Sequence, residues 1–135
     1  MSSQNHISDG DVVEMRVPAD GAYVATLRLA AASLAVRCDL TIDEIEDLRL
    51  AVDEACALLL PHANPATTLD ARFVLIPGCL VVTATVASDS NSAAGPDRSG
   101  FAWSVLSALA SEVEVDGTAG RMAITVTKRR ETAPR

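Results

Sequence analysis

The sequence predicts an α+β domain, a two-layer sandwich in which helices cover one face of a mixed, mostly antiparallel sheet. Hydrophobic residues recur every three or four positions in residues 20–37 and 41–60, which is the period of amphipathic helices. Two β-rich runs on either side of Pro77-Gly78 predict a hairpin. The complete order of predicted elements is β-α-α-β-β-loop-α-β-β, within a single domain at residues 11–130.

Composition places the chain among cytoplasmic globular proteins. It has 135 residues, enough for one domain with a substantial core, and 49% of them are hydrophobic. No apolar run reaches the roughly 18 residues of a membrane span, and the first residues lack a basic-then-apolar signal pattern. The three cysteines, Cys38, Cys56 and Cys79, lie in or beside apolar segments without CxxC spacing. They are interpreted first as small core residues and second as redox sensors.

The charge distribution is acidic and uneven. A net charge of −7 argues against direct nucleic-acid binding and against an anionic membrane surface. Residues 39–54 carry seven acids and one base, Arg49, whereas the C-terminal end is basic. Two interpretations stay open: a solvated helix face with a basic tail, or an acidic patch that steers a basic protein partner.

The first elements follow from local patterns. Residues 1–10 are predicted to form a disordered leader. Asp11–Val17 alternates as a strand, with Val13, Met15 and Val17 on one side, and Pro18 ends it. A helix opens at Ala19 or Asp20 and runs to about Arg37, with its inward face formed by Val24, Leu27, Ala31, Leu34 and Ala35.

The central helix has a clear start and a clear end. Thr41 and Glu44 fit a capping box, which makes Thr41 the N-cap. Pro61 cannot lie deep in a helix, so the helix ends around Leu60. Its core stripe consists of Ile45, Leu48, Val52, Cys56 and Leu59.

Glu54 lies on roughly the opposite side of that helix, with Leu50 and Leu58 one turn away in each direction. A carboxylate between two leucines is not a simple solvated face. A ligand or a protein partner is therefore expected to cover it.

The second half alternates between strands, a loop and one helix. His62–Ala66 is the exit loop, and residues 88–100 form a long loop of a kind that is usually functional or mobile. The helix is predicted at Phe101–Ser111, with Phe101, Val105, Leu106 and Leu109 inward and Trp103 among them. The predicted strands are Thr67–Ile76, Cys79–Ala87, Glu112–Val115 and Met122–Lys128, with a turn at Asp116-Gly117 and a disordered tail at 131–135.

Two segments resemble a known family. LRLAVDEACALLLPHA at Leu48–Ala63 resembles the N-box of the serine-kinase anti-sigma factors, members of the GHKL group of ATPases. SGFAWSVLSALASEVEV at Ser99–Val115 resembles the C-terminal helix and strand of that family. With the order of elements, the resemblance covers about residues 11–130 and implies the histidine-kinase-like ATPase fold.

The resemblance implies a nucleotide site with several changed positions. Glu54 matches the family's general base, and Leu58 stands where the family has an asparagine that holds Mg²⁺. His62 falls where the family often has a histidine. Asp89 is the candidate for the adenine-reading aspartate, but neither glycine of that motif follows it, and the glycine-rich lid is reduced to Gly95 and Gly100. Binding of ATP or ADP with Mg²⁺ is therefore expected to be weakened or lost, and no separate metal site is predicted.

Each of these residues also has a plain structural interpretation. Glu54 could be a surface acid, His62 a helix-end residue and Asp89 the start of a turn. No set of Cys, His and carboxylate residues has metal-ligand spacing, and no Ser-His-Asp set can be assembled.

The resemblance implies an anti-sigma factor that sequesters an alternative sigma factor and is countered by an anti-anti-sigma protein of the STAS class. An active serine kinase of the same fold is the alternative, and a histidine-kinase fragment is a weaker third. The acids Asp43, Glu46 and Asp47 are predicted to contact the sigma factor. A homodimer is also expected, with the apolar face of the first strand in need of cover.

Overall fold

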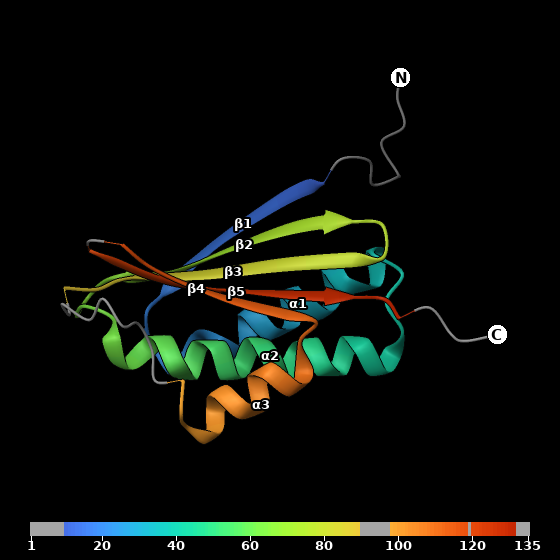
Figure 1. Ribbon diagram of the computed structural model, residues 1–135. Helices are drawn as coiled ribbons and strands as arrows, with labels where there is room; N and C mark the ends of the chain where they lie inside the picture. The colour runs from blue at the N-terminus through green and yellow to red at the C-terminus, as the bar shows by residue number, and fades with distance from the viewer. Residues whose placement is uncertain (1–9, 90–97, 119, 132–135) are drawn as a thin grey trace.

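The computed structural model describes residues 10–89, 98–118 and 120–131, and these form one five-stranded sheet with helices on one face (Figure 1). The strand order is β1-β2-β3-β5-β4, and every pairing among these strands is antiparallel. The strands are β1 Asp11–Pro18, β2 Thr68–Ile76, β3 Cys79–Ala87, β4 Glu112–Thr118 and β5 Arg121–Arg129. The helices are α1 Val24–Arg37, α2 Ile42–Leu59 and α3 Phe101–Leu109, with 3₁₀ turns at Gly21–Tyr23 and Leu60–His62. The predicted α+β class is confirmed.

The predicted boundaries of α2 are confirmed at both ends. Thr41 Oγ1 accepts a hydrogen bond from the Glu44 N–H at 3.2 Å, and Glu44 Oε1 accepts one from the Thr41 N–H at 2.8 Å. These two bonds satisfy donors that a helix start leaves unpaired. At the other end the α-helix stops at Leu59, and Pro61 lies in the 3₁₀ turn that follows.

The core lies between the sheet and the helices. On α2 the predicted stripe is buried at Leu48, Val52, Cys56 and Leu59, and Ile45 is half-buried. Ala31 and Ala35 of α1 are fully buried, and such small side chains allow a helix to approach the sheet closely. The inward rows of the three central strands complete the core with Leu69, Phe73, Leu75, Leu80, Val82, Val86, Met122, Ile124 and Val126.

The two hairpins differ in how well the sequence located them. The β2–β3 connection is Pro77-Gly78, as predicted, and Gly78 has φ +74°, which favours glycine. The predicted turn at Asp116-Gly117 is wrong. Both residues are in β4, which continues to Thr118 opposite Arg121, and Gly120, with φ +80°, lies in the connection instead.

The prediction for the third helix is partly wrong. Leu106 is fully buried, but Phe101 is 82% exposed. At about 100° per residue, Phe101 and Leu106 are roughly 140° apart around the helix, so both cannot face the core. The helix also ends at Leu109, two residues earlier than predicted, and Trp103 is half-buried with the Arg98 guanidinium 5.6 Å from its ring centre.

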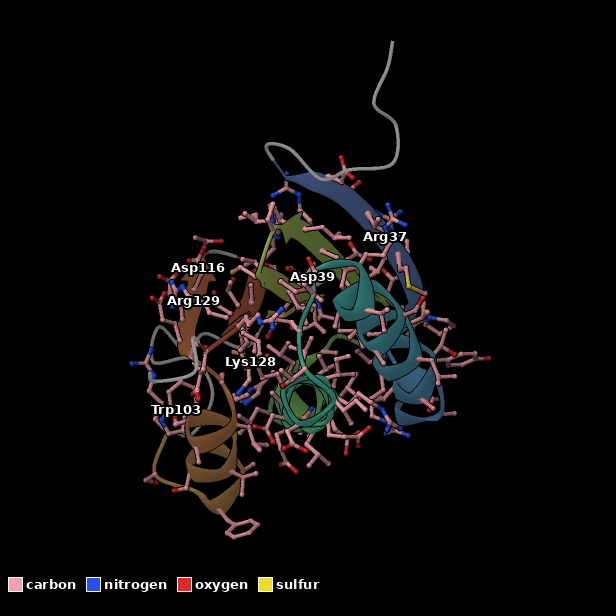
Figure 2. All side chains as sticks on the ribbon, turned by 90° about the vertical axis from the view of Figure 1, so that its right-hand side faces the viewer. Arg37, Asp39, Trp103, Asp116, Lys128 and Arg129 are labelled. Atoms are coloured by element: carbon pink, nitrogen blue, oxygen red, sulfur yellow. The ribbon has the colours of Figure 1, made fainter. Side chains whose placement is uncertain are left out.

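A buried lysine joins three elements. The side chain of Lys128 on β5 is 9% exposed, and its Nζ donates to Leu109 O at 2.7 Å and to Asp47 Oδ2 at 3.3 Å. Figure 2, which looks along α2, shows Lys128 pointing from the sheet toward the two helices. This contact fixes the end of α3 against α2 and β5. None of the described helices is long and apolar enough to span a membrane.

Candidate functional site

Glu54, Leu58 and His62 lie on successive turns at the C-terminal half of α2 and its 3₁₀ extension, and all three are half-buried. The side of α2 on which these residues lie can be inferred from Asp47. Asp47 is seven residues before Glu54, close to two helical turns, and therefore lies on nearly the same side of the helix. Asp47 faces Lys128 and the C-terminal end of α3. Because α3 runs alongside α2 in the opposite direction (Figure 1), Glu54 and Leu58 lie on the side of α2 next to the N-terminal half of α3.

Glu54 is available for a ligand or a partner. Within the described part of the chain its carboxylate has neither a hydrogen bond nor an ion pair. The neighbouring acid Asp53 differs, because its Oδ1 accepts from Arg28 Nη1 at 2.6 Å and joins α2 to α1.

Leu58 packs against the hydrophobic core. It offers no lone pair to a hard cation such as Mg²⁺, which takes oxygen ligands. The side chain at this position of α2 therefore does not fit the Mg²⁺ that the family resemblance implies.

Asn64 fixes the position of Asp89. Its side-chain Oδ1 accepts from the Asp89 N–H at 2.9 Å, and its own N–H donates to Ala87 O at 2.9 Å. The exit of α2 is thus tied to the end of β3, which brings Asp89 to the same end of the molecule as His62.

Sequence reasoning missed Asn64. The available signal was its place before Pro65 in the exit loop, where asparagine commonly bonds to backbone groups. Its partner lies 25 residues away along the chain, a distance that local patterns do not reveal.

The two glycines that were predicted to belong to the nucleotide lid add little to the described site. Gly100 immediately precedes α3 with φ −84°, a conformation open to other residues, and it provides no side-chain cap. Gly95 lies outside the described residues.

The three predicted partner-binding acids have different surroundings. Asp43 is exposed. Glu46 is exposed but accepts from Arg49 Nη1 at 2.9 Å, one turn away. Asp47 is engaged within the fold by Lys128. The exposed acidic surface of α2 is therefore centred on Asp43 and Glu46.

The first strand is a sheet edge, as predicted, since it pairs only with β2. Its apolar side chains nevertheless have cover within the chain: Val17 is buried, and Val13 and Met15 pack against the core. The exposed apolar residue on this edge is Val12, at 46%.

The fold is an antiparallel sheet with a central acidic helix and a second helix beside it. This arrangement belongs to a known class of protein domain. The family model of the histidine kinase-like ATPase domain matches residues 17–128, and the chain belongs to this family. Within it, the chain is 38% identical over 132 residues to the anti-sigma-F factor RsbW of Mycobacterium tuberculosis (strain ATCC 25618 / H37Rv), covering 91% of this chain and 76% of the relative.

Further similarities are shorter or structural. The serine-protein kinase RsbW of Bacillus subtilis (strain 168) is 46% identical over 56 residues, which cover 42% of this chain and 35% of that protein. A solved structure of RsbU and RsbW domains from Mycobacterium tuberculosis has a TM-score of 0.68 at 18% identity, and covers 88% of this chain but 32% of that one. A histidine kinase domain from Erythrobacter litoralis has a TM-score of 0.57 at 15% identity, over 84% of this chain and 61% of that one. These two structures establish the fold, and the RsbW-like relatives establish the branch of the family.

Proposed function

We propose that the protein is an anti-sigma factor that sequesters an alternative sigma factor of the general-stress or sporulation type. A STAS-class anti-anti-sigma protein would release the sigma factor by competing for the anti-sigma factor. The observation that carries this proposal is the 38% identity to an anti-sigma-F factor over 91% of the chain. The cytoplasm is the compartment in which such a regulator acts.

The exposed acids of α2 support a basic partner. Asp43 and Glu46 lie on the solvent side with Ile42, which is 79% exposed, and Leu50, which is 49% exposed. Sigma factors bind DNA and carry basic surfaces, so complementary charge speeds their encounter with this face. Asp47 contributes to the same field although its nearest partner is Lys128.

Nucleotide binding in this proposal is weak. Glu54 is present as the candidate base, but phosphoryl transfer depends on positioning and on charge neutralisation. Leu58 puts a branched apolar side chain where a hydrated cation would lie, and this disfavours Mg²⁺ more than an open space would. The side chains of His62 and Asp89, at the same end of α2, remain candidates for contact with the nucleotide.

The alternative is an active serine kinase that phosphorylates its anti-anti-sigma partner. The 46% identity to the Bacillus subtilis kinase favours it, although over 56 residues only. The position of Leu58 favours the binding function over the kinase.

The test measures binding and phosphoryl transfer separately. The purified full chain is titrated with each sigma factor of the cell that encodes it, and the rate and affinity are measured by surface plasmon resonance. Asp43→Lys with Glu46→Lys is expected to slow association and to reduce its salt dependence. Asp20→Lys, a change of an acid before α1, serves as the control.

The absence of binding to every sigma factor of that cell would overturn the proposal. In a second assay the protein is incubated with labelled ATP, Mg²⁺ and STAS proteins from the same cell. Transfer of label at the rate of an intact kinase of the family would favour the alternative.

A further inference from the structure

The sheet has a second face that no described helix covers (Figure 1). A hollow of about 440 Å³ opens on this face, across β1, β2, β3 and β5. Its lining includes the polar or charged residues Arg16, Asp70, Arg72, Thr85 and Arg121. A hollow of this volume falls within the range of small-ligand sites.

The strand register explains the hollow. In the open face, β3 and β5 present short side chains: Thr83 lies opposite Thr125, and Thr85 lies opposite Ala123. Beside them, β1 and β2 present long ones, with Glu14 opposite Arg72 and Arg16 opposite Asp70. A floor of threonine and alanine beside a wall of long charged residues leaves a trough.

Most of the charges in the trough neutralise one another. Arg16 Nε donates to Asp70 Oδ1 at 3.0 Å, and Thr68 Oγ1 donates to the same oxygen. Arg72 Nε is 3.6 Å from Glu14 Oε2, beyond hydrogen-bond length. The wall is therefore neutral overall, and Arg72 keeps donors for a further acceptor.

Arg121 supplies the excess positive charge. Within the described residues its guanidinium has no ion pair, and three arginines against Glu14 and Asp70 give the lining a charge of +1 in a chain of −7. The hydroxyl of Thr85 is likewise without a hydrogen bond among the described residues. The neighbouring Thr83 hydroxyl already bonds to Thr125 at 3.0 Å.

We propose that this trough binds a small organic anion that carries one carboxylate or phosphate group. Arg121 and the free donors of Arg72 hold the anionic group, and Thr85 donates a hydrogen bond to it. The rest of the ligand lies on the threonine and alanine floor. The site is on the opposite side of the sheet from α2 and does not depend on the proposed anti-sigma function.

The experiment uses the full chain with two probe molecules, phenyl phosphate and benzoate, and with inorganic phosphate as a third. Binding is measured by calorimetry and by chemical shifts of the β3 and β5 amides. Saturable binding of phenyl phosphate or benzoate is expected, and the stronger of the two identifies the anionic group. Inorganic phosphate alone is expected to bind more weakly, because it leaves the floor uncovered.

Three variants test the assignment. Arg121→Gln is expected to weaken binding about tenfold or more, the value of one charge-assisted hydrogen bond. Thr85→Val, which removes the hydroxyl at nearly constant volume, is expected to weaken it severalfold. Arg129→Gln is the matched control, because Arg129 lies on the same face but outside the hollow and pairs with Glu112 at 2.6 Å.

The proposal is overturned if neither organic probe binds saturably up to tens of millimolar. Equal losses in Arg121→Gln and Arg129→Gln would also overturn it, because they would show a diffuse charge effect. A change in molar mass on Arg121→Gln, measured by light scattering, would identify the face as a contact between copies of the chain and would exclude the ligand site.

Discussion

In the proposed function, Leu58 is the residue that favours partner binding over catalysis. Leu58 is half-buried on α2 and packs against the core. A leucine there contributes apolar contact, whereas an asparagine would contribute an oxygen ligand.

Leu58→Asn is therefore expected to raise Mg²⁺-dependent affinity for ATP and to lower the free energy of unfolding by about 1–3 kcal/mol. Affinity is measured with a fluorescent ATP analogue with and without Mg²⁺, and stability with urea. Leu50→Asn, two turns earlier on the same helix and 49% exposed, is the matched control and should change neither strongly. An equal gain in both variants would contradict the role given to position 58.

Cys56 is expected to be chemically inert in the folded protein. Burial, together with the nearby Asp53 carboxylate, raises the pKa of its thiol to about 12. Because the thiolate is the reactive form, the thiol stays unreactive at neutral and mildly alkaline pH. Iodoacetamide at pH 8, followed by peptide mass spectrometry, should label the half-buried Cys79 well before Cys56. Labelling of Cys56 first would show that α2 opens readily.

At the scale of elements, Glu44 ties the start of α2 to the end of the chain. Its Oε1 accepts from the Thr41 N–H, and its Oε2 accepts from the Glu131 N–H at 2.7 Å. Burial alone would raise the pKa of this carboxyl group, but the hydrogen bonds from Glu131 and Thr41 outweigh burial and hold the pKa below its ordinary value. The charged form is therefore favoured in the folded state.

This lowered pKa makes stability depend on pH. Its contribution is present above the ordinary glutamate pKa, near 4.5, and is lost as the pH falls through the lower folded-state value. Glu44→Gln is expected to reduce the free energy of unfolding by about 1–2 kcal/mol at pH 7. The difference from the wild type should shrink below pH 4.5, as measured by urea denaturation. Glu46→Gln, on the exposed face, is the control, and a difference that stays constant with pH would contradict the mechanism.

The success of sequence reasoning at this scale depends on how local each signal is. The capping box at Thr41 and the turn at Pro77-Gly78 involve residues within a few positions, and both are confirmed. The second turn was misplaced because Gly117 and Gly120 are three residues apart, and either could supply a positive φ. Phe101 was misassigned because hydrophobicity alone did not show that its side chain is exposed to solvent at the start of the helix.

The sequence predicted the part of the candidate site that lies on α2, but not the contacts that α2 makes with other segments. Glu54, Leu58 and His62 share one helix, so their spacing places them together. The contacts of Asn64 with Asp89 and of Lys128 with Asp47 join segments 25 and 81 residues apart. Long-range contacts of this kind carry no local pattern. The contact with Lys128 engages Asp47 within the fold, so that Asp43 and Glu46 are the exposed acids.

At the scale of the whole molecule, the exposed edge of β1 is the surface that we expect to form a dimer interface. An unpaired edge strand offers free backbone groups, and Val12 is exposed beside them. A homodimer is expected, with twice the 14.1 kDa chain mass by light scattering at tens of micromolar. Val12→Lys should shift the mass toward the monomer, whereas Ile42→Lys on α2 should not. A monomeric wild-type chain would refute the prediction.

The position of β5 between β3 and β4 has a consequence for synthesis on the ribosome. Residues 121–129 are made after every other strand and helix described here, yet β4 has no neighbour in the sheet except β5. Lys128, which fastens α3 to α2, lies in this stretch, and Glu131, whose N–H donates to Glu44, follows it. A nascent chain that has emerged only to residue 118 can therefore pair β1, β2 and β3 but must leave β4 without a partner strand. We therefore expect the sheet to be completed late, when β5 leaves the ribosome and takes its place between β3 and β4.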